Sequence, residues 1–201
     1  GARGGLFVRH AERHTITPEA PDWGNGVLLT ERGIADAEEV GRQLLDCGRL
    51  AIWSSPVERC VQTSTAIARG AGRPSTEARI HRYLGDPGIY FDGTGTHEEQ
   101  MRKDFHLFAD AYLDSGVAPG MRPVPKASEE LLSFVLARMQ EADCTVFVTH
   151  DLFAAALMSF LGLKAPDRDS WCEYLEGVCV LDRETGPSYF RLLGATGDSA
   201  C

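Results

Sequence analysis

The sequence has no long apolar run and little positive charge. Its 201 residues carry a formal net charge of −9, with 20 Lys and Arg against 29 Asp and Glu. No apolar run approaches the ~20 residues that a membrane-spanning helix needs. An acidic chain also lacks the basic face that non-specific binding to nucleic acid or to an anionic membrane surface requires. These shortages argue against a membrane or nucleic-acid partner, so any phosphate site must be a local cluster of arginines.

Motifs for metals and nucleotide cofactors are also missing. The six cysteines form no Cys-x-x-Cys pair, and no histidine lies at zinc-finger spacing from them. There is no Walker motif, no dinucleotide-binding glycine pattern and no carboxylate cluster. We therefore expect chemistry that needs neither a metal nor a cofactor. The cysteine pattern favours reduced thiols and a cytoplasmic protein, with Cys60 and Cys144 as small core residues.

What is present fits one globular domain over residues 1–201, since 43% of the residues are hydrophobic and 24% are charged. Apolar runs that predict strands alternate with segments of helical periodicity, and Thr30 is a plausible N-cap of the first helix. The expected strands are 6–8, 50–53, 75–80 and 144–149, and a hairpin over 177–182 and 188–193 follows at the sheet edge. This alternation predicts a three-layer α/β/α sandwich with a mostly parallel central sheet.

The alternation is interrupted by an inserted segment at about 86–124. Thr96 and Glu99 form a potential capping box, and an apolar stripe follows at 101, 105, 108 and 112. These features predict one inserted helix after an irregular loop. Such a segment is either a lid-like cover over a site at the strand ends or an ordinary connecting helix, and the sequence leaves both open.

The first expected strand ends in Arg9-His10, with Arg13 three residues further on. Ligands bind at the carboxyl ends of parallel strands, so an imidazole between guanidiniums there suggests a nucleophile in an anion-binding pocket. An exposed polar turn is the plainer interpretation of this stretch alone. The rest of the chain decides between them.

Two later strands end in similar residues. The stretch SSPVER at 54–59 predicts a helix with Ser55 as cap and Pro56 at its first position, which fixes Arg59 in the first turn beside free backbone N–H groups. The strand at 144–149 ends in His150-Asp151. Each residue alone could be a solvated or capping side chain, but successive strand ends meet at one edge of such a sheet, and that coincidence favours a site.

Four stretches carry a resemblance that covers nearly the whole chain. They are RHA at 9–11, LTERG at 29–33, SSPVERCVQT at 54–63 and VTHD at 148–151. In this order they resemble the histidine phosphatase superfamily, which includes phosphoglycerate mutase-like and acid phosphatase-like proteins. Ala11 departs from the pattern, which has glycine at that place.

The resemblance implies a phosphoglycerate mutase-like fold and a phosphohistidine formed on His10. It further implies that Arg9, Arg59 and His150 bind the phosphoryl group of a small phosphomonoester, with Arg13 as an additional contact. Forked guanidiniums suit the equatorial oxygens of phosphoryl transfer, and neighbouring cations keep His10 unprotonated. The expected activity is a metal-independent phosphatase. A phosphoglycerate-type mutase and a catalytically silent phospho-ligand binder are the alternatives.

The proton donor to the leaving oxygen has two candidates. In the mutase-like branch it is a Glu after the third strand, where this chain has Asp86. In the acid phosphatase-like branch it is the Asp after the late histidine, which here is Asp151. Asp86 could simply form a turn and Asp151 could simply cap a helix. Asp151 is slightly favoured, because it starts next to His150.

The sequence does not identify the residues that contact the rest of the substrate, beyond its phosphoryl group. Six residues in or near the inserted segment are candidates for lining the pocket: His81, Arg82, Tyr90, Phe91, His97 and Arg102. Each of them could equally be an ordinary surface or core residue. The segment is short and shows no second anion-binding cluster, which favours hydrolysis over mutase action.

Overall fold

The computed structural model describes residues 3–17, 20, 24–163, 167 and 170–194. Its centre is a six-stranded sheet in the order β3-β2-β4-β1-β5-β6. The strands are β1 (Arg3–Arg9), β2 (Leu50–Ser54), β3 (Arg79–Ile80), β4 (Cys144–Thr149), β5 (Gly177–Arg183) and β6 (Gly186–Leu192). The first four run parallel, β5 is antiparallel to β1, and β6 is antiparallel to β5. The mostly parallel sheet and its edge hairpin confirm the prediction.

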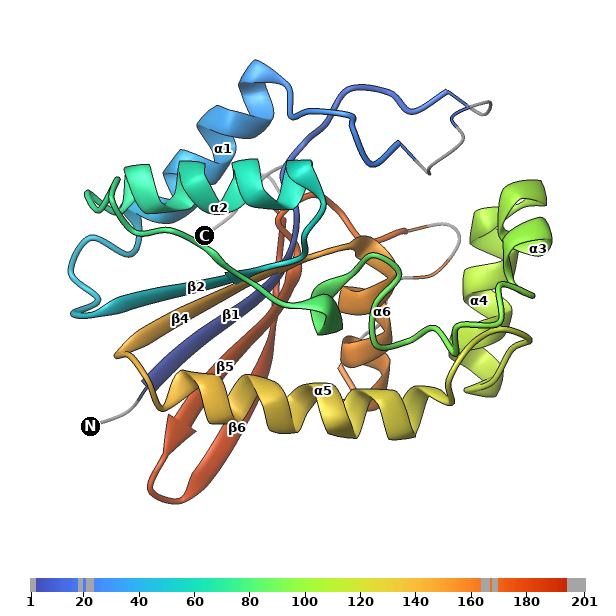
Figure 1. Cartoon of the computed structure of the whole chain (residues 1–201). Coiled ribbons are helices and arrows are strands. Elements are labelled where there is room, and N and C mark those ends of the chain that lie inside the picture. The colour runs from blue at the N-terminus through green and yellow to red at the C-terminus, as the bar shows by residue number, and fades with distance from the viewer. Residues whose placement is uncertain (1–2, 18–19, 21–23, 164–166, 168–169, 195–201) are drawn as a thin grey trace.

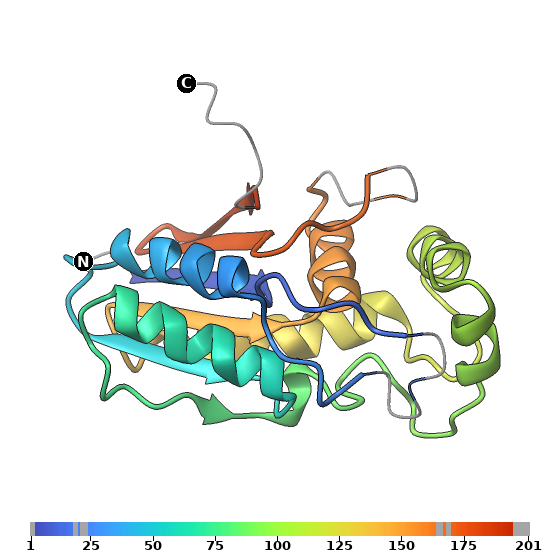
Figure 2. The ribbon, with the colours of Figure 1, turned by 90° about the horizontal axis from the view of Figure 1, so that it is seen from above.

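Helices cover both faces of this sheet, as Figures 1 and 2 show. One face carries α1 (Glu31–Arg42) and α2 (Glu58–Gly70), and the other carries α5 (Val124–Met139) and α6 (Asp151–Phe160). Alternate side chains of a strand point to opposite faces, so Phe147 packs in the core under α5 and α6 while Val146 packs under α1 and α2. The predicted three-layer α/β/α sandwich is therefore present.

Two local predictions around α2 and β3 need correction. The N-cap of α2 is Val57, without a side-chain bond, because the hydroxyl of Ser55 bonds to His150 as well as to the Val57 N–H. Pro56 thus precedes the helix, although Arg59 still lies in its first turn. The third strand is only Arg79–Ile80, since just these residues pair with β2.

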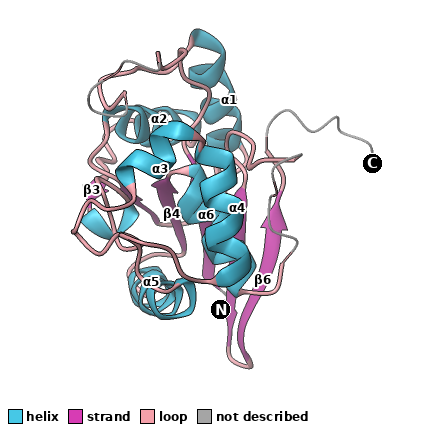
Figure 3. Cartoon of the chain, turned by 90° about the vertical axis from the view of Figure 1, so that its right-hand side faces the viewer, coloured by secondary structure: helices cyan, strands magenta, loops and turns pink. Residues whose placement is uncertain are grey.

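A 3-10 turn, η1 (Arg82–Leu84), precedes the inserted segment, which contains two helices instead of one, α3 (Glu98–Lys103) and α4 (Phe105–Ser115). Asp104 separates them with an extended backbone, and its carboxylate accepts a bond from Leu107 N at 3.0 Å, which starts α4. The predicted capping box is wrong, because α3 begins after His97 without a side-chain cap. Both helices lie beyond the carboxyl ends of the strands (Figures 1 and 3). Among the described residues, no helix is long and apolar enough to cross a membrane.

Candidate active site

His10 lies directly after β1, at the carboxyl edge of the sheet, and only 2% of it is exposed. Its N–H donates to Thr149 O of β4 at 2.9 Å, which fixes the end of the strand. Its ring atom Nδ1 lies 2.8 Å from the carbonyl oxygen of Ala11. Because a carbonyl only accepts, Nδ1 carries the ring hydrogen and Nε2 keeps its lone pair. The backbone thereby sets the tautomer that a nucleophile at Nε2 requires.

Ala11 causes no visible disturbance at this place. Its side chain is fully buried, and its N–H donates to Thr63 Oγ1 at 3.0 Å. The Thr63 hydroxyl in turn donates to Arg59 O at 2.7 Å. The methyl group is accommodated while His10 keeps its bond to the Ala11 carbonyl.

Arg59, the second residue of α2, brings its guanidinium to His10. Its Nε donates to His10 Nε2 at 3.0 Å, and its Nη1 donates to Gly24 O at 2.9 Å. The third nitrogen, Nη2, lies 3.5 Å from His150 Nδ1. Arg59 thus joins the two histidines of the site and is held in place by the loop after β1.

His150 follows β4 and faces His10, with 5.6 Å between the ring centroids. Its Nε2 lies 2.9 Å from Ser55 Oγ. A guanidinium only donates, so Nδ1 is the accepting nitrogen toward Arg59 and Nε2 donates to Ser55. The backbone of Gly85 runs against this ring, and a Cβ there would lie 2.6 Å from His150 Nε2. Only glycine lets the loop after η1 approach so closely.

The surroundings keep both imidazoles neutral. Burial, followed by the charge of Arg59, lowers the pKa of His150 to about 3. Burial is the main reason that the pKa of His10 lies well below its ordinary value. The neighbouring His150, Arg9 and Arg59 lower that pKa further. A neutral His10 with its lone pair on Nε2 is therefore the form present near neutral pH.

Arg9 and Asp151 form an ion pair beside the histidines, with 3.3 Å between Nη2 and Oδ2. Arg9 also donates to Cys172 O, and its guanidinium lies 4.2 Å above the ring of Tyr174. Asp151 accepts from Leu152 N at 2.8 Å. Burial alone would raise the pKa of Asp151, but the charge of Arg9 outweighs it and holds that pKa far below its usual range. Asp151 is consequently an ionised partner of Arg9.

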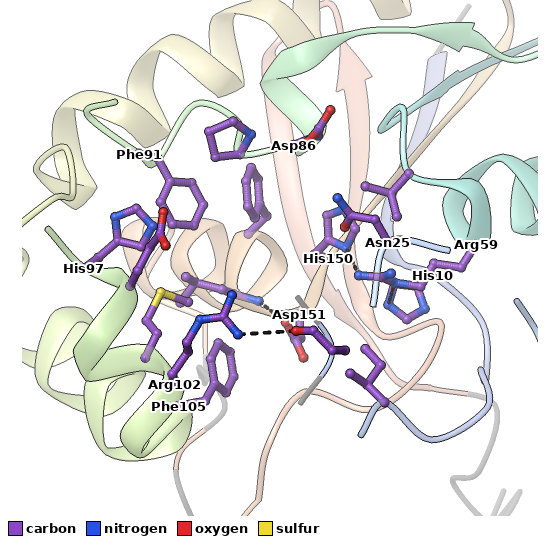
Figure 4. Close-up of a pocket in the computed structure, with 18 of the residues that line it drawn as sticks. His10, Asn25, Arg59, Asp86, Phe91, His97, Arg102, Phe105, His150 and Asp151 are labelled. Atoms are coloured by element: carbon purple, nitrogen blue, oxygen red, sulfur yellow. Dashed lines mark hydrogen bonds between the residues drawn. The ribbon is translucent and has the colours of Figure 1, made fainter. Parts of the chain in front are cut away.

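These residues open into a cavity of about 660 Å³ between the strand ends and the inserted helices. His10, Arg13, Arg59, Asp86, His150 and Asp151 all line it, whereas Arg9 does not. Figure 4 shows His10, Arg59, His150 and Asn25 together at one end. Asn25 is a lining residue that the sequence reasoning missed, because a Gly-Asn-Gly stretch indicates only a turn.

The six candidates from the inserted region separate into two groups. Phe91, His97 and Arg102 line the cavity. His81 stacks on Phe134 instead, and Tyr90 is fully buried with its hydroxyl bonded to Ser128. Arg82 donates to the Asp86 carbonyl from outside the cavity. Residues of the inserted segment therefore form part of the cavity wall, and a lid-like role for the segment stays a prediction.

Over the described part of the chain, no group of three His, Cys, Asp or Glu residues is arranged to hold a metal ion. The buried Cys60 and Cys144 pack in the core, as expected.

Comparison with known proteins gives the family. The model of the histidine phosphatase superfamily (branch 1) matches residues 6–195. The chain belongs to this superfamily. A comparison with curated proteins gives no match.

Several solved structures share the fold over nearly their whole length. The phosphoglycerate mutase of Bacillus anthracis str. Sterne has a TM-score of 0.67 at 14% identity, covering 98% of this chain and 95% of its own. A phosphoserine phosphatase from Entamoeba histolytica has 0.64 at 19%, covering 96% and 98%. The mycobacterial glucosyl-3-phosphoglycerate phosphatase has 0.61 at 17%, covering 97% and 99%. At these identities the likeness shows a phosphoglycerate mutase-like fold, and the activity must be argued from the site.

Proposed function

We propose that this chain is a metal-independent phosphatase that hydrolyses a small phosphomonoester through a phosphohistidine on His10. One observation carries the proposal: the lone pair of His10 Nε2 is fixed by the Ala11 carbonyl and lies 3.0 Å from the Arg59 guanidinium. A phosphoryl group at this place meets a nucleophile and a forked cation together.

The reaction has two displacements. In the first, Nε2 attacks phosphorus, an N–P bond forms, and the P–O bond to the alcohol breaks while its oxygen takes a proton. In the second, water attacks phosphorus and gives a proton to the group that protonated the alcohol, and the N–P bond breaks to release inorganic phosphate and His10. Arg59, Arg13, Asn25 and His150 surround the equatorial oxygens, where charge must be stabilised.

Arg9 acts mainly through its charge and through Asp151. Its guanidinium is bonded to Asp151 and to Cys172 O. It nevertheless contributes to the low pKa of His10. Its direct contact with the phosphoryl group stays a prediction from the family resemblance.

Asp86 is the proposed proton donor. A donor must hold a proton when the ester bond breaks. Asp151, the slightly favoured candidate from the sequence, is ion-paired with Arg9, which keeps it ionised. Asp86 lines the cavity one residue after Gly85, whose backbone touches the His150 ring. The geometry therefore favours Asp86 over Asp151 as the proton donor.

Hydrolysis is proposed over mutase action. A mutase must retain its phosphoenzyme against water and hold a second hydroxyl of an anionic substrate. The charged side chains that the inserted segment brings to the cavity are two acids, Asp86 and Glu98, and one base, Arg102, so it adds no second cluster of cations there. Phosphate release from 3-phosphoglycerate should accordingly exceed isomer formation, and the reverse ratio would contradict this part of the proposal.

The deciding experiment is a phosphomonoester panel assayed for phosphate release, with His10→Ala as the blank. Brief mixing with labelled substrate should give an acid-labile, base-stable phosphoprotein in the wild type and none in His10→Ala. A silent phospho-ligand binder releases no phosphate at any pH. Activity that survives in His10→Ala, or that a chelator abolishes, contradicts the proposal.

A further inference from the structure

The cavity is much larger than a phosphoryl group, and several large apolar side chains line the rest of it. Its volume of about 660 Å³ is in the range of sites that enclose small organic ligands, ~300–1,000 Å³. The proposed phosphoryl site occupies only one end (Figure 4). Among the apolar side chains along the rest are Ile16, Phe91, Met101, Phe105, Leu152 and Phe153, and the polar side chains beside them are those of His97, Glu98 and Arg102.

A row of rings extends from the phosphoryl end along this part of the cavity. The ring of His150 lies 6.0 Å from Phe153, Phe153 lies 6.2 Å from Phe91, and Phe91 lies 4.6 Å from His97, all between centroids. Phe153 is 3% exposed and packs edge-on against the buried Tyr90 at 5.1 Å. Because each ring is held by a neighbour, the row is a pre-formed surface rather than one that a ligand must organise.

The charges of the cavity favour a neutral leaving group. Arg13 acts at the phosphoryl end, where it lowers the pKa of both Arg59 and His150. Arg102, a further cation that lines the cavity, donates a hydrogen bond to the Ala20 carbonyl oxygen at 3.3 Å. The carboxyl group of Glu98 also lines the cavity, and a carboxylate repels a second anion.

We infer that the natural substrate is the phosphomonoester of a neutral, ring-bearing alcohol, and that Phe91 and Phe153 determine this specificity. The inference rests on the proposed function, since it takes the phosphoryl group to lie at His10. Such an alcohol differs in class from the phosphoserine and glucosyl-3-phosphoglycerate named for two of the similar structures.

The test compares phenethyl phosphate with ethyl phosphate and O-phosphoserine, which all release a primary alkoxide, so the bond that breaks is similar. The wild type should show kcat/KM about tenfold or more higher for phenethyl than for ethyl phosphate, with phosphoserine the poorest. Phe91→Ala should raise the KM for phenethyl phosphate about tenfold and leave ethyl phosphate within about twofold.

Two further variants separate specificity from folding. Phe91→Leu keeps an apolar side chain and should retain most of the preference. Phe134→Ala is the matched control, because Phe134 is equally half-buried but lies on α5 against His81, outside the cavity. Equal kcat/KM for phenethyl and ethyl phosphate, or a preference for phosphoserine, overturns the inference while the phosphatase activity stands.

Binding separates this inference from the proposed function. The methylene phosphonate analogues of phenethyl and ethyl phosphate resist hydrolysis, and their affinities are measured by calorimetry on the wild type and on His10→Ala. Selective binding of the phenethyl analogue without turnover of any ester supports the inference and contradicts the phosphatase. Absence of both selective binding and turnover contradicts both.

Discussion

The two ends of the cavity are built in different ways. At the phosphoryl end, strand ends and a helix start supply His10, Arg59 and His150, and directional hydrogen bonds to Ala11 O, Gly24 O and Ser55 hold them. At the far end, apolar rings on the inserted segment and on α6 are held by ring contacts. Hydrogen bonds fix the direction of a lone pair, whereas packed rings fix only a shape.

This difference separates chemistry from specificity. Changes at the phosphoryl end should lower turnover of every ester, because all share the same transferred group. Changes at the far end should alter only how esters compare with one another. The following predictions test the first half of this comparison.

Arg59 should show the largest effect. Arg59→Ala removes the donor to His10 and the cation at the phosphoryl site, so kcat/KM should fall about 10²–10³-fold for all esters. Arg59→Lys keeps the positive charge but lacks the forked guanidinium, so it should retain only part of the wild-type kcat/KM. Steady-state phosphate release measures both. Arg69→Ala, an exposed arginine on the same helix that pairs with Glu38, is the control and should match the wild type. An Arg59→Ala enzyme within about tenfold of wild type would argue against the site.

Asp86 comes next. Asp86→Asn should slow hydrolysis of an alkyl phosphate about 10²-fold and an activated aryl phosphate far less, because an aryl oxide leaves without a proton. Asp151→Asn should slow both esters alike, since it breaks the ion pair with Arg9 and not a proton transfer. The ratio of the two rates is measured in each variant. Selective loss on the alkyl ester in Asp151→Asn would restore Asp151 as the donor.

The phosphoryl end was the part of the molecule most accessible from sequence. His10, Arg59 and His150 each follow a short apolar run that stops abruptly, and parallel strands bring such ends to one edge. Local patterns therefore sufficed to place them together. Asn25 carried no such signal, because its position in the site depends on the path of a loop.

Two of the remaining differences come from tertiary contacts. Ser55 reads as a helix cap, but a partner 95 residues away, His150, takes its hydroxyl. From the sequence, Asp151 is a proton donor or a helix cap, but its pairing with Arg9 depends on a guanidinium that Cys172 O and Tyr174 also hold. The apolar stripe of the inserted segment reads as one helix, but Asp104 breaks it. For Ser55 and Asp151, a distant residue selected one of several local options of a short polar side chain, whereas Asp104 caps α4 locally through Leu107 N.

Stability should fall in acid because of the two buried histidines. Their native pKa values are lowered, to about 3 for His150, whereas an unfolded imidazole titrates near pH ~6.5. Below that value the unfolded state binds protons that the native state does not, so this stability is present above pH ~6.5 and is lost as the pH falls, by about 1.4 kcal/mol per pH unit for each histidine. Urea unfolding at several pH values measures the slope. His150→Gln should make it shallower, and an unchanged slope would mean that His150 binds a proton in the native state.

Ser55 should show the smallest effect on turnover. Ser55→Ala removes the oxygen that receives the His150 Nε2 hydrogen and frees the ring to turn, while the charges of the site stay in place. We expect kcat to fall about five- to tenfold, which is the usual worth of one neutral hydrogen bond, with KM little changed. Ser55→Thr keeps the hydroxyl and should recover part of the loss where its methyl fits. Ser133→Ala, on the exposed face of α5 with its hydroxyl bonded to Glu129 O, is the matched control. Equal losses in Ser55→Ala and Ser133→Ala would mean that the Ser55 hydroxyl does not position His150, whereas a loss confined to Ser55→Ala at unchanged thermal stability assigns it that task.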